Sequence, residues 1–191
     1  MTILHLDSAI TGDASASREL TAAIVRELTA ADSQARVTYR DLAAQPIDHL
    51  TLPGYASEES QSALAEFKAA DTVVIGAPMY NFTIPSQLKA WIDRIAVAGE
   101  TFRYTDTGAA EGLSGDKRVI VAVARGGLYG PDSGQAAFEH VESYLKAVFA
   151  FLGVTDLTFV VAEGLKISDA ARANAIGDAH GKIGRLAPQP A

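Results

Sequence analysis

The sequence contains no cysteine, which excludes disulfide bridges, thiolate metal sites and a cysteine nucleophile. Its four histidines, His5, His49, His140 and His180, show none of the HxxxH or HExxH spacings of zinc sites, so no metal site is expected. No apolar run approaches the roughly 18–20 residues that a bilayer-spanning helix needs. Met1 leads directly into strand-like sequence without a basic and then apolar leader, which argues against a secretory signal.

Basic residues are scarce in relation to acidic ones. The sequence has 16 Lys and Arg against 23 Asp and Glu, giving a net charge of −7, and the basic residues do not cluster. Nucleic-acid-binding proteins usually carry a basic patch, so no nucleic-acid partner is expected. The chain of 191 residues is long enough for one domain with a full core. These features predict a soluble cytoplasmic protein without membrane insertion.

The most informative stretch runs from residue 71 to residue 98. Thr72 to Ala77 is short, apolar and rich in β-branched residues, as in a parallel strand covered on both faces. Pro78 predicts the end of this strand at Ala77, and Pro85 predicts the first turn of a helix. The connection between them, residues 79–84, is unusually apolar for a loop. The residues alone leave open whether it packs against a flat cofactor, the core or another subunit.

A second candidate site follows the first predicted strand, Thr2 to Asp7. The residues that follow, up to Ser17, are rich in hydroxyls and lead into a helix predicted from Arg18 to Ala31. Free N–H groups and the positive end of the dipole make a helix start an anion site, to which Arg18 would add charge. Neither a P-loop nor a GxGxxG motif is present, which favours a mononucleotide phosphate. Ordinary N-capping by Ser15 or Ser17 is the structural alternative.

The rest of the chain alternates strands with helices. An extended segment at 99–108, in which Phe102 and Tyr104 alternate with polar residues, is expected beside a site or an interface. Paired glycines, Gly126 and Gly127, allow either close backbone approach to a ligand or a turn with positive φ. The remaining predicted elements are strands at 35–40, 117–124 and 155–162, and helices at 58–69, after Pro85, at 133–152 before Gly153, and after Ser168.

This pattern predicts one α/β domain over residues 1–186, with a frayed tail at 187–191. The expected architecture is a flavodoxin-like, doubly wound, five-stranded parallel sheet of order 2-1-3-4-5. In that order the loops after the first, third and fourth strands, which are the three unusual ones, converge on one crevice.

These residues resemble the FMN-dependent NADH-azoreductases, also described as NADH:quinone oxidoreductases, over most of the chain. The Pro-Met-Tyr-Asn-Phe loop together with Thr-Phe-Arg-Tyr-Thr is the most specific part of the resemblance. The stretches that carry it are Ser15-Ala-Ser17, Ala77-Pro-Met-Tyr-Asn-Phe82, Gln87-Leu-Lys89, Thr101-Phe-Arg-Tyr-Thr105, Arg125-Gly-Gly127 and Phe159-Val-Val-Ala-Glu-Gly164.

The resemblance implies a homodimer with one FMN per subunit, bound near the dimer interface. The residues that it implies for the FMN phosphate are Ser8, Ser15, Ala16 and Ser17. Those that it implies for the isoalloxazine ring and its polar edge are Met79, Tyr80, Asn81 and Phe82. Those that it implies for the pyrimidine end are Ala124, Arg125, Gly126 and Gly127. The flavin would carry the chemistry, and no catalytic side chain is expected.

Two departures from the family bear on the substrate. Ala124 stands where members often have serine, and the connection after the second strand is short against longer members. Phe102, Tyr104 and Tyr129 are candidate walls of a substrate pocket, with core or interface packing as the alternative for Phe102 and Tyr104. The resemblance implies ping-pong transfer of two electrons from NADH or NADPH to a quinone or azo compound. The alternatives are an electron carrier that docks protein partners and a flavin-free binding module.

Overall fold

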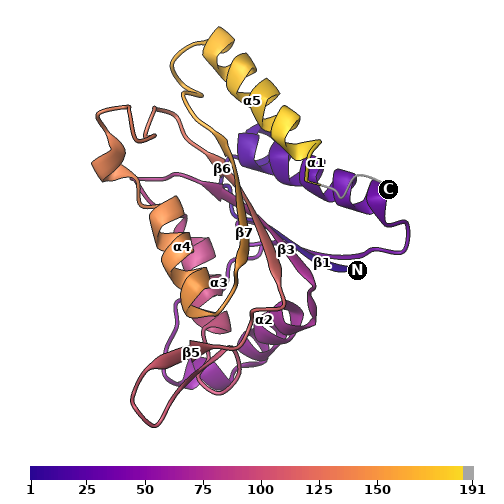
Figure 1. The fold of residues 1–191 in the computed structure, drawn as a ribbon, viewed down its shortest axis with the longest axis vertical. Helices are drawn as coiled ribbons and strands as arrows, with labels where there is room; N and C mark the ends of the chain where they lie inside the picture. Colours follow the sequence, from indigo (N-terminus) through magenta and orange to yellow (C-terminus); the bar gives the residue numbers. More distant parts are fainter. Residues whose placement is uncertain (187–191) are drawn as a thin grey trace.

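A computed structural model describes residues 1–186, so the predicted tail at 187–191 lies outside the described residues. The main sheet has five parallel strands in the order β2-β1-β3-β6-β7 (Figure 1). These strands are β1 Thr2–Asp7, β2 Arg36–Asp41, β3 Thr72–Pro78, β6 Arg118–Ala124 and β7 Asp156–Ala162. Counted within the main sheet, this is the predicted order 2-1-3-4-5, and the flavodoxin-like α/β fold is confirmed.

Helices cover both faces of the sheet (Figure 1). On one face lie α1 Ala16–Ala31 and α5 Asp169–Ile183, and on the other lie α2 Glu58–Ala69, α3 Ser86–Ile95 and α4 Glu142–Phe151. The apolar side chains of α1 at a spacing of four, Leu20, Ile24 and Leu28, are buried against the sheet. None of the helices within residues 1–186 combines the length and the apolar character needed to cross a membrane.

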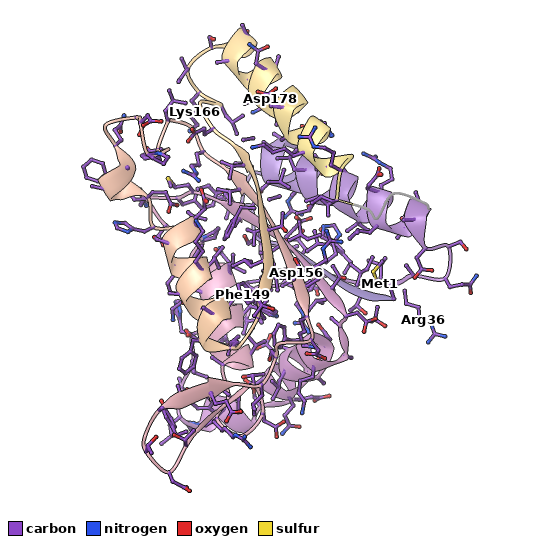
Figure 2. The ribbon with its side chains drawn as sticks, in the orientation of Figure 1. Met1, Arg36, Phe149, Asp156, Lys166 and Asp178 are labelled. Carbon is purple, nitrogen blue, oxygen red and sulfur yellow. The ribbon has the colours of Figure 1, made fainter. Side chains whose placement is uncertain are left out.

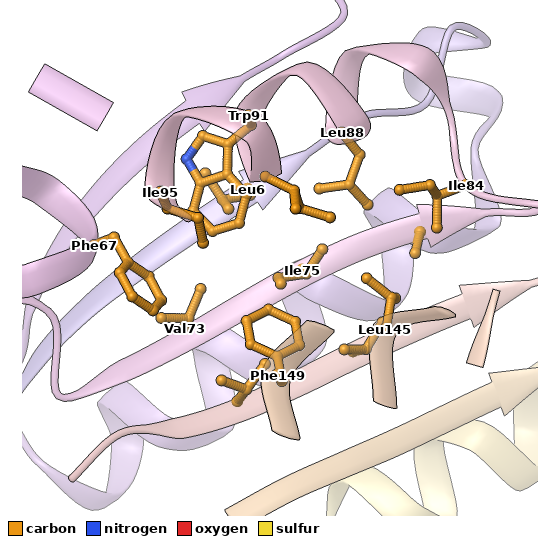
Figure 3. Packing of buried hydrophobic residues seen from close by; sticks show 14 of the residues in the cluster. Leu6, Phe67, Val73, Ile75, Ile84, Leu88, Trp91, Ile95, Leu145 and Phe149 are labelled. Atoms are coloured by element: carbon orange, nitrogen blue, oxygen red, sulfur yellow. The ribbon is translucent and has the colours of Figure 1, made fainter. Parts of the chain in front are cut away.

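The larger core lies between the sheet and α2, α3 and α4. Trp91 of α3 is fully buried there, and its ring meets that of Phe67 edge to face at 6.0 Å between centroids. Phe149 of α4 packs into the same layer beside Val73 and Ile75 of β3 (Figure 3). Trp91 is therefore a core residue. A second core, centred on Ile3 of β1 and Ile120 of β6, fills the other face.

A small antiparallel hairpin, β4 Phe102–Tyr104 and β5 Ala110–Gly112, stands apart from the main sheet. The extended segment predicted at 99–108 contains β4, but the second strand was not predicted. The hairpin rests on the carboxyl end of α4, where a Cβ added at Gly112 would overlap the backbone of Gly153. The N–H of Ser114 donates to the carbonyl of Leu152 at 2.8 Å. The hairpin therefore lies far from the edge of the sheet where β3 and β6 end (Figure 1).

The helix predicted from residue 133 was wrong in its first half, because α4 begins only at Glu142. Gly134 has a left-handed φ of 71°, and a short 3-10 turn, Ala136–Phe138, follows it. The Glu139 carboxylate then accepts the N–H groups of Val141, Glu142 and Ser143 at 2.8, 2.8 and 3.1 Å. Glu139 thus caps the true start of the helix.

Smaller differences concern the two prolines and the start of α1. β3 continues to Pro78, because the N–H that bonds to Ala124 at this point belongs to Met79, at 2.8 Å. Pro85 is the N-cap of α3 and not a residue of its first turn. α1 begins at Ala16, two residues before the predicted start. The other main strands begin and end within one residue of their predicted limits.

Two predicted helix boundaries are confirmed. Gly153 follows α4 with a φ of 88°, a conformation that glycine adopts at little cost. Ser168 caps α5 by accepting the N–H of Ala171 at 3.1 Å.

Candidate functional site

A cleft of about 890 Å³ lies beyond the end of β3 and extends over the start of α3. Three of the predicted site residues, Met79, Tyr80 and Asn81, line it. The other walls include Ile10 from the loop after β1, Tyr144 from α4 and Lys166 from the loop after β7. Residues far apart in the sequence therefore meet at the carboxyl end of the sheet, where open α/β sheets bind ligands.

The residues Tyr80 to Thr83 form a tight two-residue turn. The N–H of Tyr80 donates to the carbonyl of Thr83 at 2.9 Å, and the reverse bond is 3.2 Å long. Asn81 and Phe82 have φ values of 47° and 74°, and no other non-glycine residue within 1–186 has a positive φ. Left-handed φ at both central residues is the pattern of a type I′ turn, where Asn is favourable and Phe is strained. Such strain often marks a functional site.

The strained turn is held by the segment that precedes α4. The N–H of His140 donates to the carbonyl of Phe82 at 3.0 Å, and the Thr83 hydroxyl donates to the carbonyl of His140 at 3.1 Å. The half-exposed ring of Phe82 packs against Phe138 and Tyr129, with centroids 5.2 and 6.3 Å away. Within residues 1–186, the N–H groups of Asn81 and Phe82 have no acceptor. The turn therefore presents two fixed backbone donors.

The loop after β1 places hydroxyls at the start of α1. Ser15 is the N-cap, and its hydroxyl oxygen accepts the N–H of Arg18 at 3.3 Å, so capping by Ser15 is confirmed. The hydroxyls of Ser15 and the fully buried Ser17 are 3.0 Å apart. The N–H groups of Ala16 and Ser17 find no acceptor in the described part of the chain. One of the two hydroxyls donates to the other, so one hydroxyl proton and two amides at the helix start remain available to an anion.

Ser8, also predicted for the phosphate, already has a hydrogen-bond partner within the protein. Its fully buried hydroxyl donates to the carbonyl of Gly76 at 2.6 Å and so joins β1 to β3. The proton of Ser8 is already used there. The loop after β1 also contacts the turn after β3, since the N–H of Ile10 donates to the Tyr80 hydroxyl at 3.1 Å.

Arg18 does not present its charge to the loop, contrary to expectation. Its guanidinium forms a two-pronged ion pair with Asp41, with distances of 2.7 and 2.8 Å, and also donates to the carbonyl of Ala9 at 3.0 Å. The hydrogen bonds from Arg18 hold the pKa of Asp41 below its usual value, against the effect of burial. Arg18 therefore ties the end of β2 to the loop and leaves the hydroxyls and amides of the loop as the donors available to a ligand.

Asp7, the last residue of β1, lies behind the same loop. Burial alone would raise its pKa, but hydrogen bonding and charge from His5, with hydrogen bonds from Thr21 and Tyr39, lower it overall. Its oxygens accept from Thr21 at 2.8 Å and from Tyr39 at 3.1 Å. The base of the loop is therefore a packed network of charged and polar groups.

The segment from Ala124 to Gly127 ends β6 beside the cleft. Neither Gly126 nor Gly127 has a positive φ, so the left-handed turn considered for them is wrong. A Cβ at Gly126 would come within 3.2 Å of the Lys166 side chain, and one at Gly127 within 3.2 Å of the Tyr129 ring. The backbone of this segment is therefore closely covered by neighbouring side chains.

Arg125 is a buried tie between three segments. Its guanidinium forms an ion pair with Glu142 of α4 and lies 3.6 Å from Glu163 after β7. Glu163 in turn accepts the N–H of Tyr129 at 3.0 Å. The side chain of Arg125 thus fixes the loops around the site, while its backbone remains part of the segment beside the cleft.

The predicted pocket walls do not all lie at the cleft. Tyr129 does not line it, but contacts Phe82, which adjoins the lining residues Asn81 and Thr83. Phe102 instead packs on Phe151 at 4.6 Å and Tyr104 at 5.5 Å, in the hairpin at the other end of the molecule. Within one chain, Phe102 and Tyr104 therefore do not line the cleft.

Several residues that line the cleft were not predicted as site residues, among them Lys89, Tyr144 and Lys166. Lys89 belongs to the Gln-Leu-Lys motif, which was a usable signal, whereas Tyr144 and Lys166 lie in unremarkable stretches. Burial lowers the pKa of Lys89, but the bond to Asp93 at 2.5 Å and nearby acidic groups raise it more. Burial raises the pKa of Tyr144, so its hydroxyl stays protonated.

Comparison with known proteins agrees with this architecture. A protein-family model described as flavodoxin-like fold matches residues 1–186. An azoreductase structure from Bacillus anthracis superposes with a TM-score of 0.86 at 27% identity, covering 98% of this chain and 99% of that one. A second B. anthracis structure, an FMN-dependent NADH-azoreductase in complex with FMN, gives a TM-score of 0.82 at 30% identity, with 98% and 100% covered.

Relatives found by sequence share a higher identity with this chain than these two structures do. An FMN-dependent NADH:quinone oxidoreductase of Xanthomonas campestris pv. campestris is 52% identical, with 97% of this chain and 99% of that protein aligned. The protein of the same name from Gluconobacter oxydans is 50% identical, with 97% and 100% aligned. The chain therefore belongs to the FMN-dependent NADH:quinone oxidoreductase family of flavodoxin-like proteins.

Proposed function

We propose that this protein binds FMN in the cleft and transfers two electrons from NADH or NADPH to a quinone or azo compound by a ping-pong mechanism. The observation that carries the proposal is the strained turn at 80–83. Its two central residues hold left-handed φ values and direct no N–H to the protein itself. A protein maintains such strain where exposed donors are useful to a ligand.

The residues at this edge of the sheet fit FMN. The amides of Ala16 and Ser17, with the hydroxyls of Ser15 and Ser17, would hold the phosphate at the positive end of α1. Ser8 would support that loop through its bond to Gly76, not as a donor to the phosphate. The residues proposed for the ring are Met79, Tyr80, Asn81 and Phe82, and those for its pyrimidine end are Ala124, Arg125, Gly126 and Gly127.

Bound FMN would supply the redox chemistry, accepting a hydride from the reduced nicotinamide and passing two electrons to the acceptor. The chain's contribution would be binding, orientation and electrostatics. The N–H groups of Asn81 and Phe82 are fixed by the turn, so they can stabilise negative charge that develops beside them without reorganising. Apolar side chains such as Met79 and Ile84 would keep water from that edge of the cleft.

The acceptor would be a flat molecule, since aromatic residues border the cleft. Tyr80 and Tyr144 line it. The connection between β2 and α2 is proposed to wall less of the pocket than in longer relatives. The alignment with the X. campestris protein spans 202 positions, more than the 191 residues here, so that relative has residues that this chain lacks.

A homodimer remains part of the proposal. Phe102 and Tyr104 lie in the hairpin remote from their own cleft, and Tyr104 is 64% exposed. Leu113 and Phe151 nearby are also exposed. An interface between two copies would cover these apolar side chains. In that arrangement the hairpin would serve the assembly and not its own cleft.

The experiment is an anaerobic titration of the purified protein. We expect a yellow holoprotein whose flavin absorbance bleaches with NADH and returns when a quinone is added. A colourless protein that takes up no FMN would overturn the proposal. A yellow protein that NADH does not bleach would overturn the reductase activity while leaving flavin binding in place.

A further inference from the structure

The cleft has a charge opposite to that of the whole protein. The protein carries a net charge of −7, but the charged side chains lining the cleft are Lys89 and Lys166. No carboxylate within residues 1–186 lines it. When the charged side chains of a cleft are all cations, the electrostatic potential there is positive even in an acidic protein, and it favours an anionic ligand.

The two lysines are not equivalent. The ammonium of Lys89 is bonded to Asp93 at 2.5 Å, so much of its charge is neutralised within α3. Lys166 forms no ion pair with any carboxylate in residues 1–186, and its side-chain nitrogen has no hydrogen-bond acceptor there. The uncompensated charge of the cleft is therefore that of Lys166.

The position of Lys166 is fixed by its backbone and its aliphatic stem. Its N–H donates to the carbonyl of Gly126 at 3.0 Å, and its stem carbons lie 3.2 to 3.6 Å from where a Cβ of Gly126 would be. Figure 2 shows Lys166 in the loop that follows β7, at the end of the sheet. A lysine whose stem packs on the backbone keeps its ammonium at the boundary between protein and solvent.

We propose that Lys166 is a specificity-determining residue that makes this enzyme prefer acceptors carrying an anionic group, such as sulfonated or carboxylated quinones and azo compounds. The inference rests on the proposed function and names the substrate class of the same cleft. The flat ring of the acceptor lies against apolar and aromatic walls, and its anionic group meets the ammonium of Lys166 at the rim. A neutral acceptor binds the same walls without that contact, so the charge sets preference between acceptors.

The direct test is binding of two non-reducible probes to the oxidised holoenzyme, naphthalene-2-sulfonate and its neutral analogue naphthalene-2-sulfonamide, followed by the flavin absorbance. We expect Lys166→Gln to weaken sulfonate binding roughly fivefold, the size of a partly exposed ion pair, and to leave sulfonamide binding unchanged. Lys166→Arg should restore the sulfonate preference. Raising the salt concentration should reduce the preference in the native protein but not in Lys166→Gln.

The control variant is Lys182→Gln. Lys182 is also exposed and lines a separate groove beside α5, so its loss changes net charge equally without touching the cleft. Equal loss of sulfonate binding in Lys182→Gln and Lys166→Gln would overturn the proposal, because overall charge would then explain it.

A turnover measurement separates the remaining explanations. The quantity is kcat/KM for 1,4-naphthoquinone-2-sulfonate divided by that for 1,4-naphthoquinone, with NADH as donor. We expect this ratio to fall roughly fivefold in Lys166→Gln. If Lys166→Gln slows the reduction of both acceptors equally and shifts the reduction potential of the flavin, the proposal is overturned. It is also overturned if the variant loses activity only when NADPH replaces NADH as donor. If neither quinone is reduced by the native protein, the proposed function itself fails, which is a distinct result.

Discussion

The loop after β1 and the turn after β3 lie at the same edge of the sheet, yet they hold their hydrogen-bond donors in different ways. In the loop, side-chain contacts hold the donors in place: Ser15 caps α1, and Arg18 forms an ion pair with Asp41. In the turn, the backbone itself is strained, with left-handed φ at Asn81 and Phe82. The first region is organised by charge and hydroxyls, and the second by conformation.

The difference teaches where each region should be sensitive. A site built from hydroxyls loses affinity when a side chain is shortened, because each donor is a separate group. A site built from backbone N–H groups keeps its donors through most side-chain changes and loses them only when the conformation shifts. The loop should therefore respond to the identity of its side chains, and the turn to which φ values the new residue tolerates.

The largest expected effect tests the loop. Replacing Ser15 and Ser17 together with alanine should weaken FMN binding about 100-fold, since each hydrogen bond to a charged group contributes about 1.5–3 kcal/mol. Riboflavin, which lacks the phosphate, should bind the variant and the native apoprotein alike. Flavin titration of apoprotein measures both.

Ser15 is also a helix cap, so a matched cap variant is needed. Ser168→Ala removes the cap of α5 in the same way but lies outside the loop, and it should leave FMN affinity unchanged. Equal losses for riboflavin and FMN in the double variant would show that the loop holds no phosphate.

The next effect tests charge as the organiser of the loop. Asp41→Asn should lower the stability of the apoprotein at pH 7 by about 2 kcal/mol, because Arg18 loses a charged partner. The pKa of Asp41 in the folded protein lies below its ordinary value of 3.8, so this contribution is present above 3.8 and is lost as the pH falls through the folded value. The difference between native protein and Asp41→Asn should therefore shrink in acid, as urea unfolding between pH 7 and 3 would show.

Glu111→Gln is the matched control, since it breaks the exposed pair with Arg103 in the hairpin. It should change stability little at any of these pH values. A gap between native protein and Asp41→Asn that stays constant down to pH 3 would contradict the assigned role of the ion pair.

Substitutions in the turn should have a smaller effect, which depends on whether the new residue tolerates a left-handed φ and not on its side-chain hydrogen bonds. Asn81→Ala should slow flavin reduction by NADH roughly tenfold, because alanine tolerates the left-handed φ less well and the donors shift. Asn81→Gly, which accepts this φ freely, should keep nearly the native rate. Stopped-flow reduction compares them, with thermal unfolding of the apoproteins changing little. If glycine slows the reaction as much as alanine, the Asn side chain itself acts, and the contrast between the two regions is lost.

The smallest effect concerns the contact between the two regions. Tyr80→Phe removes the hydroxyl that accepts the N–H of Ile10, a neutral hydrogen bond near the surface. We expect FMN affinity to fall no more than about fivefold, equivalent to roughly 1 kcal/mol. A loss as large as that of the double serine variant would mean that the loop and the turn act as one unit.

The sequence predicted the sheet well because the signals for parallel strands are local. The mostly apolar runs at 72–77 and 119–124 indicate buried strands without any knowledge of their neighbours. The start of α4 could not be read, because its cap is the Glu139 carboxylate and the preceding segment is held by Phe82, some sixty residues earlier in the chain. A periodic apolar pattern does not contain information on such long-range contacts, so it cannot show where the helix begins.

The candidate site, like the fold, was predictable where the sequence signal is local and not where it depends on distant contacts. The hydroxyl-rich loop and the apolar turn were visible as anomalies for their positions. The pairing of Arg18 with Asp41 was not, because a cation at a helix start has the same sequence signal whether it faces a ligand or a carboxylate. Lys166 was missed for a similar reason, since its place at the cleft depends on the path of the loop after β7.

The contact between Gly112 and Gly153 limits how this chain can vary. Every side chain, even alanine, would separate the hairpin from the end of α4 at that point. Gly108, at the hairpin tip, has open space where a Cβ would lie, although its φ of 80° still disfavours other residues there. A library of variants that randomises this hairpin and Gly153 should therefore recover changes among residues 105–107, while nearly every functional clone keeps both glycines of the contact.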